Sequence, residues 1–170
     1  IRDSSLPGST QGFQIAKYGG EKSFGKVSNT THEGAKVLEI SFDEVEGMSS
    51  VVATTPTFAS SDVKNMRTYE LMATPTLYSG QNLSAELLSP VDNTTDLDVS
   101  LRIRHYGKDN DLIDVDSNVG TLAPGDSCSF NWVLPDTGGQ PIAEVGVVVR
   151  SKEQKASGRI LLDRLSWSGT

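Results

Sequence analysis

Residues Leu97–Tyr106 read LDVSLRIRHY, and apolar residues occupy every second position of this stretch as far as Ile103. In an α-helix, successive members of that apolar set would lie on nearly opposite faces, whereas in a β-strand they all share one face. The other face of the same strand would carry Arg102, Arg104 and Tyr106. The stretch therefore predicts a half-buried β-strand with a polar outer face.

The same alternation recurs in further segments that are separated by Gly, Pro, Asn and Asp turn formers. The clearest are Lys36–Phe42, Cys128–Leu134, Val145–Val149 and Arg159–Asp163. Roughly nine to eleven short candidate strands can be placed along the chain, and one sheet cannot bury so many inward rows. We therefore predict an all-β fold, an antiparallel two-sheet β-sandwich of jelly-roll type, with residues 1–170 as one domain. Residues 64–72 are the only segment that could form a short helix as well as a strand.

Composition and charge exclude several classes of function. The 170 residues include 22 acidic and 15 basic side chains, for a net charge of -7. This balance argues against a nucleic-acid binder, which normally presents a basic face. No apolar run approaches the roughly 20 residues of a membrane span, and we expect no signal peptide within these residues. One cysteine and two histidines cannot build a structural zinc site or a disulfide framework.

The start of the chain and its sequons bear on where the protein works. Because the numbering begins at Ile1 and not at Met, we expect an excised or processed part of a longer protein. Asn-x-Ser/Thr sequons occur at Asn29, Asn82 and Asn93, and they are compatible with secretion. We therefore expect an extracellular location.

Catalytic patterns are weak. With two histidines and no Gly-x-Ser-x-Gly motif, the sequence disfavours a nucleophilic triad. Acidic residues such as Asp109, Asp111, Asp114 and Asp116 are expected in loops, and Glu144 is the strand carboxylate that a glycosidase would most plausibly use. We expect no enzyme, and a small jelly-roll glycoside hydrolase or lyase stays open as an alternative.

A polar platform is the best candidate for binding. If the strands around residues 100, 131 and 147 adjoin in one sheet, their outward side chains form a surface with a single aromatic ring. Arginine matches carboxylate and phosphate groups bidentately, so this surface favours a polar or anionic glycan. The candidate ligand-binding residues are Arg102, Arg104, Tyr106, Asn131, Glu144 and Arg150.

Two stretches carry a likeness to a known family. Residues 27–40 contain His32-Glu33-Gly34 with Leu38 four residues later, and Ser157–Trp167 ends the chain with an apolar pair followed by Asp163. These motifs resemble the opening turn and the last strand of galactose-binding-like, jelly-roll carbohydrate-binding modules. The resemblance implies a non-catalytic carbohydrate-binding accessory domain, joined to a catalytic domain in the same polypeptide. It also implies that the polar or anionic glycan binds on an exposed sheet face or in the loops at one end.

The last residues carry a narrower likeness. Residues 162–170 are similar to the C-terminal β-domain of some ADP-ribosylglycohydrolase-family proteins. A structural or interaction domain that packs on its parent enzyme, without binding sugar, remains the main alternative. Its expected signature is an exposed apolar patch, which Trp167 and the final strand could supply.

A structural calcium ion is a further implication of the resemblance. The resembled modules often bind calcium between the opening turn and the last strand. The matching positions here are Glu33, Lys36 through its carbonyl, and Asp163. Oxygen ligands of this kind suit Ca²⁺. The chain departs from the family at Phe13–Gln14, where an acidic residue is usual, so one ligand charge is missing.

Overall fold

The computed structural model describes residues 13–17, 24–45, 50–57, 77–109, 111–151 and 156–168. Within these ranges the chain forms eleven β-strands. They are β1 (Gln14–Lys17), β2 (Phe24–His32), β3 (Ala35–Val45), β4 (Ser50–Pro56), β5 (Asn82–Leu88), β6 (Leu97–Tyr106), β7 (Leu112–Asp116), β8 (Gly120–Leu122), β9 (Ser127–Val133), β10 (Ile142–Ser151) and β11 (Ala156–Trp167).

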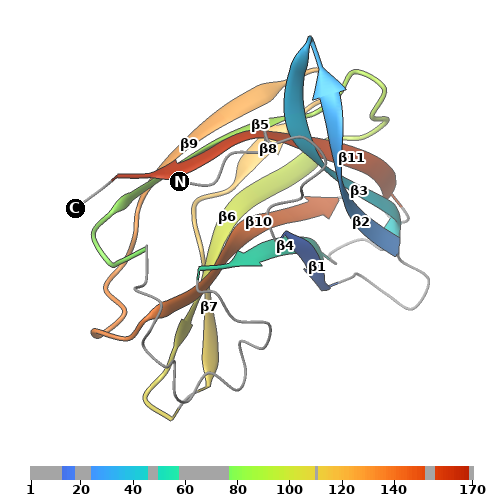
Figure 1. Cartoon of the computed structure of the whole chain (residues 1–170). Coiled ribbons are helices and arrows are strands. Elements are labelled where there is room, and N and C mark those ends of the chain that lie inside the picture. Colours follow the sequence, from blue (N-terminus) through green and yellow to red (C-terminus); the bar gives the residue numbers. More distant parts are fainter. Residues whose placement is uncertain are drawn as a thin grey trace.

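The strands form two antiparallel sheets that face each other (Figure 1). Sheet I has the order β1-β4-β10-β6-β7, with β8 also paired to β6, and sheet II has the order β2-β3-β11-β5-β9. The predicted antiparallel two-sheet β-sandwich is therefore confirmed. Residues 64–72, where a helix or a strand was open, lie outside the described ranges. Across those ranges, no helix is long and apolar enough to cross a bilayer.

One hydrophobic core fills the space between the sheets. The apolar positions of β6 point inward and are almost fully buried, as are the matching positions of β10 and β11. Each buried Leu, Ile or Val contributes about 1.5–3 kcal/mol relative to an exposed position. The alternation that predicted β6 thus also places Arg102 and Arg104 on the outer face of sheet I.

The outer face of sheet I is not uniformly exposed. Val52, Val148 and Ser100 form one cross-strand row on β4, β10 and β6, and each is at most 1% exposed. The accessible part of this face therefore lies beyond that row, toward the charged side chains of β6, β7 and β10.

Candidate functional site

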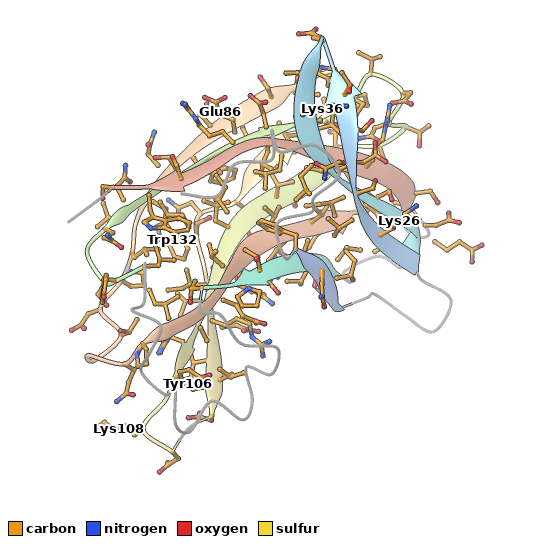
Figure 2. All side chains as sticks on the ribbon, in the orientation of Figure 1. Lys26, Lys36, Glu86, Tyr106, Lys108 and Trp132 are labelled. Carbon is orange, nitrogen blue, oxygen red and sulfur yellow. The ribbon has the colours of Figure 1, made fainter. Side chains whose placement is uncertain are left out.

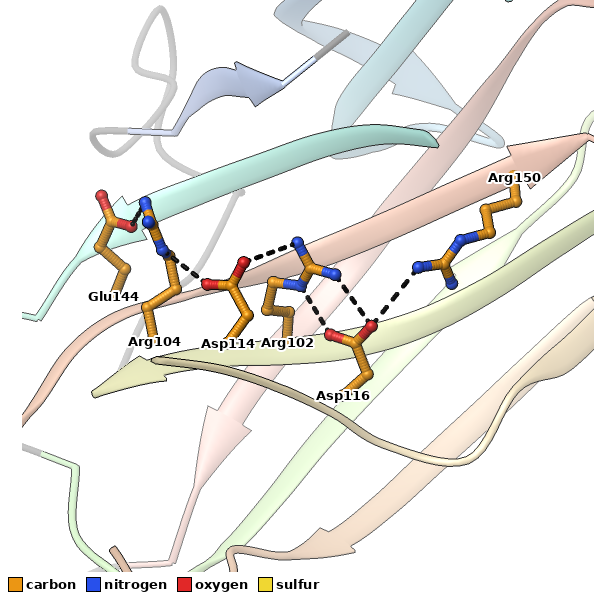
Figure 3. Close-up of polar contacts among 6 residues, drawn as sticks. All are labelled: Arg102, Arg104, Asp114, Asp116, Glu144 and Arg150. Carbon is orange, nitrogen blue, oxygen red and sulfur yellow. Dashed lines mark hydrogen bonds and ion pairs between the residues drawn. The ribbon is translucent and has the colours of Figure 1, made fainter. Parts of the chain in front are cut away.

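Strand register brings six charged side chains together on the outer face of sheet I. Arg102 lies opposite Asp116 on β7 and Gly146 on β10, and the next outward residue, Arg104, lies opposite Asp114 and Glu144. With Arg150 of β10 they form a connected line of contacts (Figure 3). We call this set the β6–β7–β10 ion-pair network, and its members are Arg102, Arg104, Arg150, Asp114, Asp116 and Glu144.

Arg102 stands at the centre of the network. Its Nε and Nη2 donate to the two carboxylate oxygens of Asp116, at 2.6 and 2.9 Å, in a bidentate arrangement. Its Nη1 donates to Asp114 at 3.2 Å. Such paired contacts fix the guanidinium plane as well as its position. The side chain is 11% exposed, so its orientation is set by the network and not by solvent.

Opposite Arg102, Gly146 leaves the β10 backbone without a side chain. A Cβ at this position would lie 2.1 Å from the carbonyl oxygen of Ala53 on β4, which is too close for any real contact. Glycine is therefore required for the close approach of β4 and β10.

The other two arginines of the network, Arg104 and Arg150, also pair with carboxylates. Arg104 donates from Nε to Asp114 at 2.7 Å and from Nη1 to Glu144 at 2.9 Å. Arg150 lies 3.5 Å from Asp116. Three guanidinium groups thus face three carboxylates, and the network as a whole is neutral.

The electrostatics of the pair at the centre agree with this geometry. Burial raises the pKa of Asp116, but the hydrogen bond and charge of Arg102, with a contribution from Arg150, outweigh burial and lower the pKa below its ordinary value. The hydrogen bond to Asp116 raises the pKa of Arg102 in turn. Both groups therefore stay charged across the physiological range.

This neutrality bears on the type of ligand. The sequence favoured a polar or anionic glycan because of the arginines, but their charge is already compensated by carboxylates. An incoming carboxylate or phosphate would have to displace Asp114, Asp116 or Glu144. Fixed donors and acceptors remain suited to uncharged hydroxyl groups, which can both donate and accept. This arrangement favours a polar ligand over an anionic one, and the type of glycan stays a prediction.

Two of the six predicted residues are not part of this surface. Asn131 lies on β9 in sheet II, where its amide oxygen accepts from Asn82 and Ser84. The strands around residues 131 and 147 therefore do not adjoin, and the expected single platform does not include Asn131. Tyr106 lies at the end of β6 and is only 7% exposed, so its ring offers no open face for stacking.

The tryptophans also face inward. Trp132 and Trp167 are half-buried and pack against the core from β9 and β11, on either side of Leu83. Figure 2 shows Trp132 between the sheets, whereas Glu86 of the same sheet points away from them. The apolar patch expected of an interaction domain is therefore not formed by Trp167. Among the aromatic residues whose side chains the structure describes, Tyr78 alone is exposed.

The predicted calcium ligands do not gather into a cluster of acidic side chains. Glu33 lies in the turn between β2 and β3 and is 87% exposed, and Nζ of Lys36 donates to Thr31. Asp163 lies on β11. No group of three or more His, Cys, Asp or Glu side chains that could hold a metal occurs in the described residues. The acidic side chains therefore give calcium no support, and it stays a prediction of the resemblance.

The sequon at Asn93 is buried in the fold. The Asn93 side chain donates to Ser89 and to the carbonyl of Arg159, and it accepts from the Arg159 amide N–H. A glycan would replace one of the two N–H groups of this nitrogen and remove one of these bonds, and Asn93 is only 7% exposed, so the folded chain disfavours glycosylation there.

Sequence reasoning missed Asp114 and Asp116 as members of the site, because it placed them in a loop. They lie on β7, a five-residue edge strand in which Ile113 and Val115 alternate with them. Aspartate is depleted in strands, so two of them in so short a strand masked its pattern. The signal that could have found them is their spacing of two, which matches that of Arg102 and Arg104.

No family model and no curated protein matches this chain. Solved structures do match it in fold. One, from work on the promiscuous specificity of carbohydrate-binding modules of the β-sandwich superfamily, has a TM-score of 0.67 at 14% identity over 95% of this chain. This chain spans 58% of the length of that one. The C-terminal family 22 module of Clostridium thermocellum Xyn10B has a TM-score of 0.61 at 10% identity, over 99% of this chain and 91% of that one.

A third match is to a larger chain. The CBM22-1–GH10 modules of Clostridium thermocellum xylanase 10B, in complex with xylohexaose, have a TM-score of 0.57 at 8% identity over 100% of this chain and 29% of that one. These likenesses establish that the chain has the β-sandwich fold of carbohydrate-binding modules.

Proposed function

We propose that the chain is a non-catalytic carbohydrate-binding domain, and that it binds a neutral or otherwise polar glycan on the outer face of sheet I. The observation that carries this proposal is the β6–β7–β10 ion-pair network, which holds donors and acceptors in fixed positions on an outer sheet face. The fold likeness supports it, because the family 22 module among the similar structures was studied for the role of its cleft in ligand binding.

The energetics also favour a binding role for the network over a purely structural one. Ion pairs at a protein surface contribute about 0–1 kcal/mol each, and β6, β7 and β10 are already joined by backbone hydrogen bonds. The more exposed members, Asp114 and Arg150, therefore add little to stability through their ion pairs, whereas Arg102 and Glu144, whose side chains are 11% and 13% exposed, add more. Their fixed guanidinium and carboxylate groups suit the hydroxyl groups of a sugar, each of which can donate and accept.

A hydrolytic role has less support from the same residues. Glycoside hydrolysis needs a carboxylic acid that keeps its proton, which requires a raised pKa. Here the pKa of Asp116 is lowered, and Asp114 and Glu144 both accept hydrogen bonds from arginine. One carboxylate with a lowered pKa, and two others that accept hydrogen bonds from arginine, fit recognition better than proton transfer.

The domain would act through a catalytic partner in the same polypeptide. Holding an enzyme beside its polymeric substrate raises the effective concentration without any new catalytic group. The similar xylanase fragment, in which a CBM22 module is joined to a GH10 module, supports this arrangement. A parent of the ADP-ribosylglycohydrolase family, an extracellular location and a structural calcium ion stay part of the proposal on the resemblance alone.

Affinity electrophoresis tests the proposed function. The purified chain would be run through native gels that contain xylan, mixed-linked β-glucan, galactomannan or polygalacturonate. We expect retardation by at least one neutral polysaccharide and less by polygalacturonate. Migration unaffected by every polymer, from a chain whose circular dichroism shows an intact β-fold, would overturn the proposal.

A further inference from the structure

A cavity lies at one end of the sandwich, and none of the residues of the ion-pair network lines it. This cavity of about 470 Å³ opens between the turn that precedes β5 and the loop that joins β9 to β10. Leu77 and Tyr78 line it from the first segment, and Asp136, Thr137 and Gln140 line it from the second. Its volume lies within the range of about 300–1,000 Å³ that is usual for small-ligand pockets.

The two segments are held together by hydrogen bonds. The Gly80 amide N–H donates to the carbonyl of Leu134, and the Leu134 N–H donates to the carbonyl of Gln81, both at 2.9 Å. The hydroxyl groups of Ser79 and Thr137 lie 3.0 Å apart, and Thr137 also donates to the carbonyl of Gln140 at 2.6 Å. These bonds fix the walls, so a ligand would meet a preformed pocket and lose little free energy to ordering it.

Several side chains of the pocket have hydrogen-bonding groups that are not used within the described part of the chain. Together with an exposed aromatic residue, these groups match the chemistry of a sugar. Tyr78 is 41% exposed, while its neighbour Leu77 is buried. Neither the Tyr78 hydroxyl nor the side-chain amide of Gln140 makes a hydrogen bond within the part of the chain that the structure describes. Asp136 uses one carboxylate oxygen for the Gly138 N–H, which leaves the other. An aromatic face with amide, hydroxyl and carboxylate groups beside it suits a pyranose ring, which has an apolar C–H face and hydroxyl groups at its edge.

The charge of the residues that line the cavity limits the type of sugar that it can bind. Asp136 is the one charged residue among those that line the cavity in the described part of the chain. Its carboxylate would repel a uronic acid. Beyond Thr137, Gly138 and Gly139 adopt positive φ angles of 65° and 78°, and nothing lies within 4 Å of where a Cβ would stand at either. The mouth beside them is therefore open for a sugar ring to enter.

We propose that this end pocket binds the terminal residue of a neutral oligosaccharide, with Tyr78 stacking on the ring and Gln140 and Asp136 binding its hydroxyl groups. The inference rests on the proposed function only in taking a sugar as the ligand. It assigns a second site, suited to a chain end, whereas the open sheet face suits the middle of a chain.

Two-dimensional ¹H–¹⁵N spectra separate the two sites. The chain would be titrated with xylohexaose, cellohexaose and mannohexaose as neutral probes, and with trigalacturonic acid as the anionic one. We expect at least one neutral probe to shift the amide signals of Tyr78, Thr137 and Gly139, and trigalacturonic acid to leave them in place. The Tyr78→Ala variant should lose at least tenfold in affinity at these signals while those of Arg102 and Asp116 respond as before. Tyr78→Phe, which keeps the ring, should lose less.

Val133→Ala is the matched control, since it truncates another exposed apolar side chain, on the outer face of sheet II. It should leave every affinity unchanged. No shift at the pocket signals with any neutral probe overturns the end pocket, as does a shift whose affinity survives Tyr78→Ala. Signals that move at the pocket and not at Arg102 or Asp116 would instead overturn the sheet-face site, so the two proposals fail separately.

Discussion

Two arginines with carboxylate partners stand on opposite outer faces of this sandwich, and they are placed differently. On sheet I, Arg102 bonds Asp114 and Asp116, which both lie on the neighbouring strand β7. On sheet II, Arg159 of β11 bonds Glu39 of β3 and Asp92, which lies in the loop between β5 and β6. Similar chemistry joins neighbouring strands in one case and ties a loop to a strand in the other.

The difference lies in what else holds each set of residues. Strands β6 and β7 are joined by backbone hydrogen bonds whatever the arginine does. The loop next to Arg159 has backbone hydrogen bonds at Ser89, but side chains join it to β11, because Asn93 bridges to both the N–H and the carbonyl of Arg159. The Arg159 side therefore supports the fold, and the proposal is that the Arg102 side serves a ligand.

The largest expected effect concerns the loop on sheet II. Asn93→Ala removes three hydrogen bonds and leaves the buried groups that they satisfied without partners, at a cost of about 3 kcal/mol. The melting temperature should fall by roughly 6–12 °C for a chain of this size. Scanning calorimetry measures the change. Retardation of the folded variant in polysaccharide gels at 10 °C should match the wild type, and a shift below 2 °C would show that the loop is held otherwise.

The next effect tests the network itself. Arg102→Ala removes charge-assisted hydrogen bonds of about 1.5–3 kcal/mol each from any ligand that uses the guanidinium, so polysaccharide affinity should fall at least tenfold. Stability should fall by about 1–3 kcal/mol, because Arg102 is largely buried while its partners Asp114 and Asp116 can still be solvated. Affinity electrophoresis measures the loss of polysaccharide affinity, and thermal unfolding measures the change in stability.

Arg159→Ala is the matched control for that experiment, since it removes the same side chain from the same number of carboxylate partners. It should leave polysaccharide affinity unchanged. Equal losses of affinity in both variants would contradict the assignment of the site to sheet I. Arg102→Lys sharpens the comparison, because it keeps the charge but cannot make the bidentate contact with Asp116.

A smaller effect comes from pH. The pKa of Asp116 is lowered in the folded chain, so its ion pair stabilises the fold fully above the unfolded value of about 3.9. That stability is lost as the pH falls through the lowered folded pKa. Asp116→Asn should therefore be less stable than the wild type at pH 7, by under about 1 kcal/mol. The gap should close in urea titrations as the pH falls below 4, and a gap that widens there would contradict the lowered pKa.

The smallest expected effect concerns calcium. If Asp163 is a ligand, as the resemblance implies, chelation with EDTA should lower the melting temperature, and Asp163→Ala should abolish that response. The missing acidic residue near Phe13 favours a shift of only a few degrees, because ligand charge sets calcium affinity. An identical melting temperature with EDTA and with added calcium would remove the ion from the proposal.

Much of the fold was predictable because burial is a local property of a strand. The alternation in Leu97–Tyr106 told which side chains point inward, and the same rule placed Phe130 and Trp132 toward the core. It also placed Arg102 and Arg104 on an outer face, where the structure has them. Strand β7 was not predicted, because two aspartates are unusual in so short a strand, although Ile113 and Val115 keep the alternation.

The sequence by itself determined which face of each strand is buried, since side-chain direction alternates along any extended chain. It could not determine which strands become neighbours, since pairing is decided by contacts between distant segments. That is why Asn131 was grouped with Arg102 and Glu144, although β9 pairs with β5 in the other sheet. Only the tertiary structure placed Asp114 and Asp116 against the arginines, and so turned an expected cationic surface into a neutral one.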